Sequence, residues 1–151
     1  VGEKNKTAFF NDEIKNYKNS GSYEISNKYS GNKILINSID NLIENGEIIP
    51  KKKIIIKMDI EGYEFLALQG LIKTIKKYDT FIFFEFSIKI VSNHDNLLIL
   101  FTKFLKENNL KIFNSEFYEV KIEDLFDKVK HLPKGHEVVG NYIISKNINF
   151  N

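Results

Sequence analysis

The chain has 151 residues, 42% of them hydrophobic, and its 22 basic and 20 acidic side chains give a net charge of +2. This length fits one domain with a sizeable core rather than two domains. Every basic residue is a lysine, because the sequence contains no arginine, and the lysines are interspersed with acids along the chain. The guanidinium groups and the concentrated basic face typical of nucleic-acid binding are therefore lacking, and we expect no nucleic-acid partner.

The sequence contains no cysteine, which excludes disulfides, thiolate metal sites and cysteine nucleophiles. It has no uninterrupted apolar run near the roughly 20 residues needed to span a membrane, and no charged segment followed by an apolar one at its start. The first residue is Val1 rather than methionine. We expect a fragment or processed chain that is soluble and cytoplasmic.

Residues 1–50 are polar and carry several turn clusters around short strand-like pieces such as residues 7–10. We therefore expect an irregular or edge segment here. A brief helix near its end has Ser38 or Asp40 as a cap, and the dipeptide at 45–46 would stop it.

Residues 51–151 have the pattern of an α/β unit. Apolar and β-branched runs predict strands at 53–60, 81–86, 110–113 and 138–144, and helical periodicity predicts helices at 63–77, 95–108 and 122–129. The run at 53–60 does not alternate strictly, which is typical of a parallel strand covered on both faces. The order of elements predicts a doubly wound α/β sheet, and we expect residues 1–151 to form a single domain.

Three carboxylates lie close together in residues 57–64, KMDIEGYE, where the first of these strands ends. Asp59 and Glu61 are two residues apart and would share a face at the carboxyl end of the strand, where open α/β sheets bind ligands. Gly62 permits a sharp turn of the backbone after the strand, and Glu64 begins the next helix at its positive end. Mutual repulsion should raise the pKa of at least one carboxyl group, which suits a general base for a hydroxyl proton or a set of ligands for a divalent cation.

A structural interpretation of this cluster is that Asp59 or Glu61 caps the following helix while Glu64 satisfies its dipole. Glu85 favours a functional interpretation, because an acid inside an apolar strand is costly to bury unless it lies at the strand end or has a partner. A neighbouring parallel strand would bring Glu85 near Asp59. A buried pair with Lys57 would explain Glu85 equally well.

The combined spacing of these residues resembles that of FkbM-type methyltransferases. The match consists of the K-x-D-x-E-G-x-E stretch at 57–64, then Leu68, Gly70 and Glu85 on the next strand. Residues 1–3 and 38–42 resemble weaker upstream stretches of the family, and the C-terminal third matches in layout alone.

The resemblance implies a Rossmann-like class I methyltransferase sheet. It also implies methyl transfer from S-adenosylmethionine to a hydroxyl group of a sugar, glycolipid or similar small-molecule acceptor. Carried over to this sequence, Asp59 is the hydroxyl base or the residue that positions the acceptor, with Glu61 and Glu85 in support. Lys57 and Glu64 are expected to be structural.

Methyltransferases of this type bind the cofactor with an N-terminal strand, a Gly-rich loop and an acidic residue that ends the next strand, and this sequence contains none of these. Its eight glycines are never closer than the five-residue step from Gly135 to Gly140, so it has no G-x-G loop. We therefore expect an incomplete sheet without the cofactor-binding strands, and we assign no cofactor-binding residue. The chain alone is expected neither to hold S-adenosylmethionine tightly nor to catalyse. Its free sheet edge would favour self-association into homo-oligomers.

Two other functions stay open at this point. A non-catalytic α/β binding module would keep the acidic strand end, and a glycosyltransferase or hydrolase would use Asp59 and Glu61 to hold a divalent metal. The spacing of His94, His131 and His136 gives no indication of a metal site, so surface or hydrogen-bonding roles are expected for them. The phenylalanines of the second predicted strand are expected to pack in the core.

Overall fold

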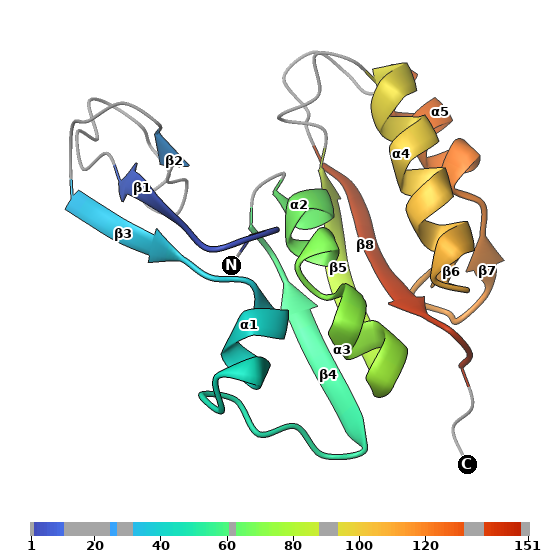
Figure 1. The fold of residues 1–151 in the computed structure, drawn as a ribbon. Helices are drawn as coiled ribbons and strands as arrows, with labels where there is room; N and C mark the ends of the chain where they lie inside the picture. Colours follow the sequence, from blue (N-terminus) through green and yellow to red (C-terminus); the bar gives the residue numbers. More distant parts are fainter. Residues whose placement is uncertain are drawn as a thin grey trace.

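Two β-sheets organise the computed structural model, which describes residues 2–10, 25–26, 32–60, 63–87, 94–131 and 138–148 (Figure 1). In chain order the elements are β1 (Lys6–Phe10), β2 (Ile25–Ser26), β3 (Asn32–Ile36), α1 (Ile39–Glu44), β4 (Lys53–Met58), α2 (Glu64–Gln69), α3 (Ile72–Lys77), β5 (Asp79–Ser87), α4 (His94–Glu107), β6 (Lys111–Phe113), β7 (Glu119–Val120), α5 (Ile122–Lys130) and β8 (Val138–Ser145).

The smaller sheet is antiparallel, has the strand order β2-β1-β3, and lies within the first 50 residues. Residues 1–50 were expected to form an irregular or edge segment with short strands, and this sheet lies within them. Strands β1 and β3 pair along their whole length, from Lys6 opposite Ile36 to Phe10 opposite Asn32. Ala8 and Ile36 are buried, which gives the short strands an apolar side despite the polar composition of the segment.

The larger sheet has the strand order β4-β5-β8-β6-β7. Strands β4 and β5 are parallel, whereas β8 is antiparallel to both of its neighbours, β5 and β6. Strands β4, β5 and β6 therefore run in one direction and β8 runs against them. The prediction of an α/β fold is confirmed, but the sheet is mixed rather than parallel throughout, because β8 runs antiparallel to the two strands that flank it.

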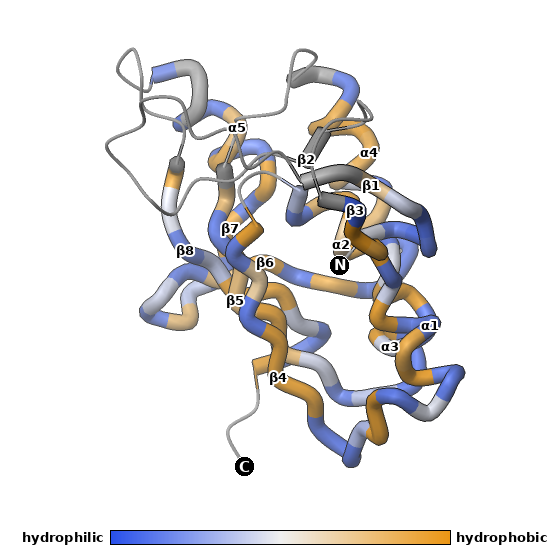
Figure 2. The backbone as a smooth tube through the Cα atoms, turned by 90° about the vertical axis from the view of Figure 1, so that its left-hand side faces the viewer, coloured by the Kyte–Doolittle hydropathy of each residue, from blue (hydrophilic) through white to orange (hydrophobic). Residues whose placement is uncertain are grey.

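Helices α2, α3 and α4 lie on one side of the larger sheet, as the side view shows (Figure 2). Leu68, Leu71 and Ile75 of the α2–α3 region are almost fully buried, as are Ile82 of β5 and Ile144 of β8. Helix α5 joins this core through Phe126, whose ring centroid lies 5.3 Å from that of Phe86. The core therefore forms between this one face of the sheet and its helices.

The opposite face of β4 and β5 is exposed within the described part of the chain. Ile55 is 75% exposed and Phe83 is 42% exposed, whereas Phe84 and Phe86 are buried. Residues along a strand point alternately to its two faces, so only every second residue of β4 and β5 faces the helices. The expectation that β4 is covered on both faces was therefore wrong, as was the expectation that Phe83 packs in the core.

The single helix expected over residues 63–77 is divided into α2 and α3 at Gly70. The N-terminal segment crosses this point so closely that a Cβ atom on Gly70 would overlap the carbonyl oxygen of Gly2. The carbonyl group of Gly70 accepts a hydrogen bond from the backbone N–H of Asp40 at 3.0 Å. Contacts with distant parts of the chain, rather than the local pattern, therefore break the helix.

Candidate active site

The first component of the candidate site is the carboxyl end of β4. Met58 is buried at the last position of the strand, and Asp59 follows it in an exposed position. The Nζ atom of Lys57 donates a hydrogen bond to Oδ2 of Asp59 at 2.6 Å, and both side chains are largely exposed. Exposed ion pairs contribute at most about 1 kcal/mol, so another polar group can displace Lys57 from this carboxylate at small cost.

The second component is Glu64, the first residue of α2, which is only 6% exposed. Its Oε1 atom accepts a hydrogen bond from the backbone N–H of Ile60 at 3.2 Å. This bond connects the start of α2 to Ile60, two residues after the end of β4. Glu61 and Gly62, which the sequence places within this loop, lie outside the described residues.

The third component is Glu85, which is half-buried near the end of β5 and pairs with Asn141 of β8. The parallel register ends with Met58 of β4 beside Phe84 of β5. Asp59 and Glu85 each come one residue after this pair, so the two carboxylates lie at the same level of the sheet. In the structure Lys57 is hydrogen-bonded to Asp59, whereas the sequence analysis considered it as a partner for Glu85.

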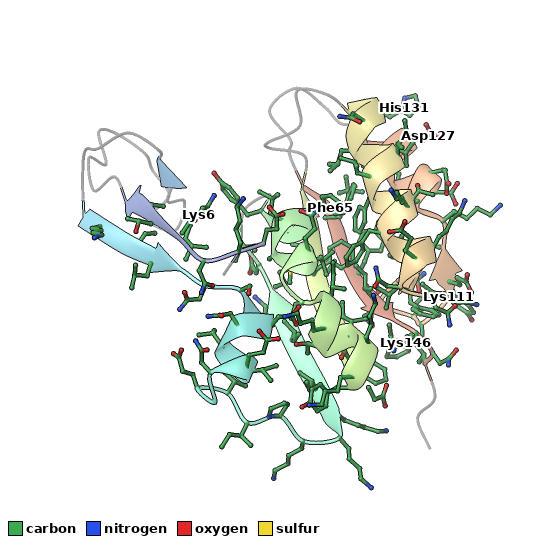
Figure 3. The ribbon with its side chains drawn as sticks, viewed as in Figure 1. Lys6, Phe65, Lys111, Asp127, His131 and Lys146 are labelled. Atoms are coloured by element: carbon green, nitrogen blue, oxygen red, sulfur yellow. The ribbon has the colours of Figure 1, made fainter. Side chains whose placement is uncertain are left out.

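The histidines do not gather at this position in the part of the chain that the structure describes. His131 follows α5 and is exposed, and Figure 3 shows it near the start of α4, away from β4. His94 is the first residue of α4, and His136 lies outside the described residues. No group of three or more His, Asp or Glu side chains suited to a metal ion is found among the described residues.

Asp40 has a role that the sequence did not predict. The cap of α1 is Ser38, whose Oγ atom accepts a hydrogen bond from the N–H of Asn41 at 3.2 Å. The buried Asp40 carboxylate instead accepts three hydrogen bonds at the start of α3, from the N–H of Lys73 at 2.8 Å, the N–H of Thr74 at 2.8 Å and the Oγ1 of Thr74 at 2.6 Å. The partners are more than 30 residues apart, so no local sequence signal marks this cap.

A polar cleft of about 530 Å³ lies beside this cap. It is lined by the N-terminal segment, α1 and the α2–α3 region, and includes Asn41, Gln69, Glu44 and Lys73. The side chain of Lys73 donates to Glu44 at 2.5 Å, and this hydrogen bond, together with the charge of Glu44, raises the pKa of Lys73. These contacts hold α1 against α3 and support the α2–α3 region that follows the end of β4.

The arrangement is that of an α/β protein with acidic groups where adjacent parallel strands end, which is the usual ligand-binding edge of such sheets. The family model described as the Methyltransferase FkbM domain matches residues 1–123. The chain belongs to this family, and the resemblance noted in its sequence is confirmed. No curated protein and no solved structure matches the sequence. Within the described residues, no helix is long and apolar enough to cross a membrane.

Proposed function

We propose that this chain is the acceptor-side part of an S-adenosylmethionine-dependent O-methyltransferase, which methylates a hydroxyl group of a sugar, glycolipid or similar small molecule. Membership of the FkbM methyltransferase family supports the reaction class. The observation that carries the assignment to this site is the β4–β5 register, which brings Asp59 and Glu85 to the same level where both strands end.

In this proposal Asp59 accepts the proton of the acceptor hydroxyl or orients that hydroxyl for attack. Asp59 is exposed, and within the described part of the chain its partner is the weakly held Lys57, so a hydroxyl group can approach the carboxylate. Glu61 and Glu85 support Asp59 by binding neighbouring hydroxyl groups of the acceptor. Glu64 joins the start of α2 to Ile60 through its side-chain hydrogen bond.

S-adenosylmethionine supplies the methyl group, and the protein has to align it with the acceptor. Residues 1–151 contain no G-x-G loop, and the cluster at the end of β4 consists of carboxylates without a glycine-rich turn. These residues fit an acceptor hydroxyl better than the cofactor, so no residue here is assigned to the cofactor. We propose that the Rossmann-like sheet is incomplete within this chain and that the cofactor-binding strands lie outside residues 1–151.

The test compares this chain with a longer chain that includes the proposed cofactor-binding strands. Calorimetric titration of S-adenosylmethionine and its demethylated product should show tight binding to the longer chain and none to residues 1–151. Binding to neither chain would refute the methyltransferase proposal. Activity that depends on added Mg²⁺ or Mn²⁺ would favour instead a metal site built on Asp59 and Glu61.

The role of Asp59 is tested in the longer chain by replacing it with asparagine. General bases contribute about 10²- to 10⁴-fold, so Asp59→Asn should lower the rate of methyl transfer by at least about 100-fold while cofactor affinity stays unchanged. Asp79→Asn is the matched control, because it removes the same charge from an exposed acid at the opposite end of β5. Equal rates for the two variants would exclude Asp59 as the base.

A further inference from the structure

Lysine side chains from two separate segments gather at the amino end of the β4–β5 pair. The N–H of Asp79 donates to the carbonyl oxygen of Lys52 at 3.3 Å, which joins the start of β4 to the chain that follows α3. Exposed lysines meet here from both segments, Lys51 and Lys52 before β4 and Lys76 and Lys77 in the last turn of α3. The start of β4, the end of α3 and the loop over residues 45–52 lie together at one end of the molecule (Figure 1). The interspersed charges of the sequence did not predict this basic surface.

The acids near these four lysines do not neutralise them. The carboxylate of Asp79 is already paired with Lys53 at 3.9 Å, and that of Glu44 is paired with Lys73. Glu47 is exposed in the loop over residues 45–52 and adds one negative charge. The four lysines themselves have no ion-pair partner among the described residues. This end of the molecule therefore has a net positive charge that is available to an anionic partner.

An apolar stretch lies directly before the lysines of the loop. Ile49 is 87% exposed, Ile48 is 40% exposed, and Pro50 connects them to Lys51 and Lys52. Single exposed aliphatic side chains are common on protein surfaces, but here the apolar stretch is continuous with the basic surface. Proteins that bind the surface of a membrane combine these two features, because apolar side chains enter the acyl boundary while lysines contact anionic headgroups. A soluble polyanion such as RNA would leave Ile49 in water and is usually bound through arginine, which this sequence lacks.

We propose that this basic end of the molecule, formed by Ile49 and the four lysines, binds the surface of an anionic lipid bilayer. Ile49 inserts between the headgroups, and the ammonium groups of the lysines contact the phosphate and carboxylate groups of the lipids. Asp59 follows the opposite, carboxyl end of β4, so the candidate active site faces away from the bilayer in this orientation. The inference does not depend on methyl transfer.

Co-sedimentation of the full chain with lipid vesicles tests this inference directly. Vesicles of phosphatidylcholine with roughly 30% phosphatidylserine should bind the chain at about 0.1 M NaCl, and both pure phosphatidylcholine and about 0.5 M NaCl should weaken binding at least about tenfold. Each lysine near an anionic surface contributes roughly fivefold to the partition coefficient, so Lys51→Gln/Lys52→Gln should lower it about 25-fold. Lys103→Gln/Lys106→Gln is the matched control, because it removes two exposed lysines of α4, and it should change the coefficient less than about threefold.

Insertion of Ile49 is measured separately with an environment-sensitive fluorophore. The sequence contains no cysteine, so Ile49→Cys creates one labelling site. The emission of a nitrobenzoxadiazole label at this position should shift to shorter wavelength when anionic vesicles are added, because the label leaves water. Ile99→Cys is the control, since Ile99 of α4 is 65% exposed and lies outside the basic end, and its label should not shift.

Three results would overturn the proposal. The first is equal binding to neutral and anionic vesicles, and the second is an equal loss of binding in the two lysine variants, with circular dichroism showing that both are folded. The third is a label at position 49 that stays in water while the chain binds vesicles, or tighter binding of the chain to single-stranded RNA than to anionic vesicles. Either form of the third result would favour a soluble polyanion as the partner instead.

Discussion

The buried carboxylate of Asp40 should contribute strongly to stability, although it lies outside the acidic cluster at the end of β4. Replacement with alanine removes three hydrogen bonds at the start of α3, two from backbone N–H groups and one from the hydroxyl of Thr74, which is 2% exposed. Loss of a helix cap costs about 1 kcal/mol, and a buried hydroxyl without a partner costs about 2 kcal/mol. Asp40→Ala should therefore lower the free energy of unfolding by about 3 kcal/mol.

Urea denaturation followed by circular dichroism measures this loss, with the m-value expected to stay constant. Thr74→Val should cost about 1 kcal/mol, and the double variant should cost less than the sum because both changes remove the same hydrogen bond. Glu44→Ala is the matched control, since it removes an acid of α1 whose ion pair with Lys73 is exposed. The reasoning is refuted if Asp40→Ala destabilises no more than Glu44→Ala.

Two further predictions concern the same region. Gly70→Ala should lower stability by about 1 to 3 kcal/mol through overpacking and should speed amide exchange at Gly2, which the new methyl group would displace. Gly46→Ala, at a positive φ with no neighbour within 4 Å, should cost only about 1 kcal/mol and leave the exchange of Gly2 unchanged; the same exchange rate in both variants would contradict the close contact. The pKa of Lys73 should lie above its ordinary value of 10.5, chiefly because of its hydrogen bond to Glu44. While Glu44 is ionised, the ion pair stabilises the fold fully below pH 10.5 and loses its effect as the pH rises through the raised pKa. Glu44→Gln should lower the NMR-measured pKa of Lys73.

The sequence predicts those helices and strands that are determined by the residues within them. The β-branched run of β4 and the apolar periodicity of α4 lie within a single element, and the structure agrees with the prediction to within a few residues at each end. The division of the helix at Gly70 could not be predicted, because its cause is a backbone contact with Gly2 at the other end of the segment. The exposure of Phe83 depends on which sheet face the helices cover, and a strand of uninterrupted apolar residues carries no signal for this.

The candidate site was predictable in part for the same reason. The motif around Asp59 is contiguous, and the prediction that Glu85 lies on a parallel strand beside the one that leads to Asp59 agrees with the observed register. The partner of Asp59 was not predicted, because Lys57 had been considered for Glu85, which lies at the same level on the neighbouring strand. The catalytic roles of Asp59, Glu61 and Glu85 stay predictions until the variants are assayed.

The placement of β8 has a consequence for biosynthesis. This last strand of the larger sheet lies between β5 and β6, which are made before it. Until residues 138–145 leave the ribosome, the β4–β5 pair and the β6–β7 hairpin cannot join, and one edge of β5 has no strand beside it. Such non-local pairing slows folding and exposes an intermediate to aggregation. A nascent chain that stalls before β8 should therefore be a chaperone substrate, and its completion should trigger assembly of the whole sheet in one late step.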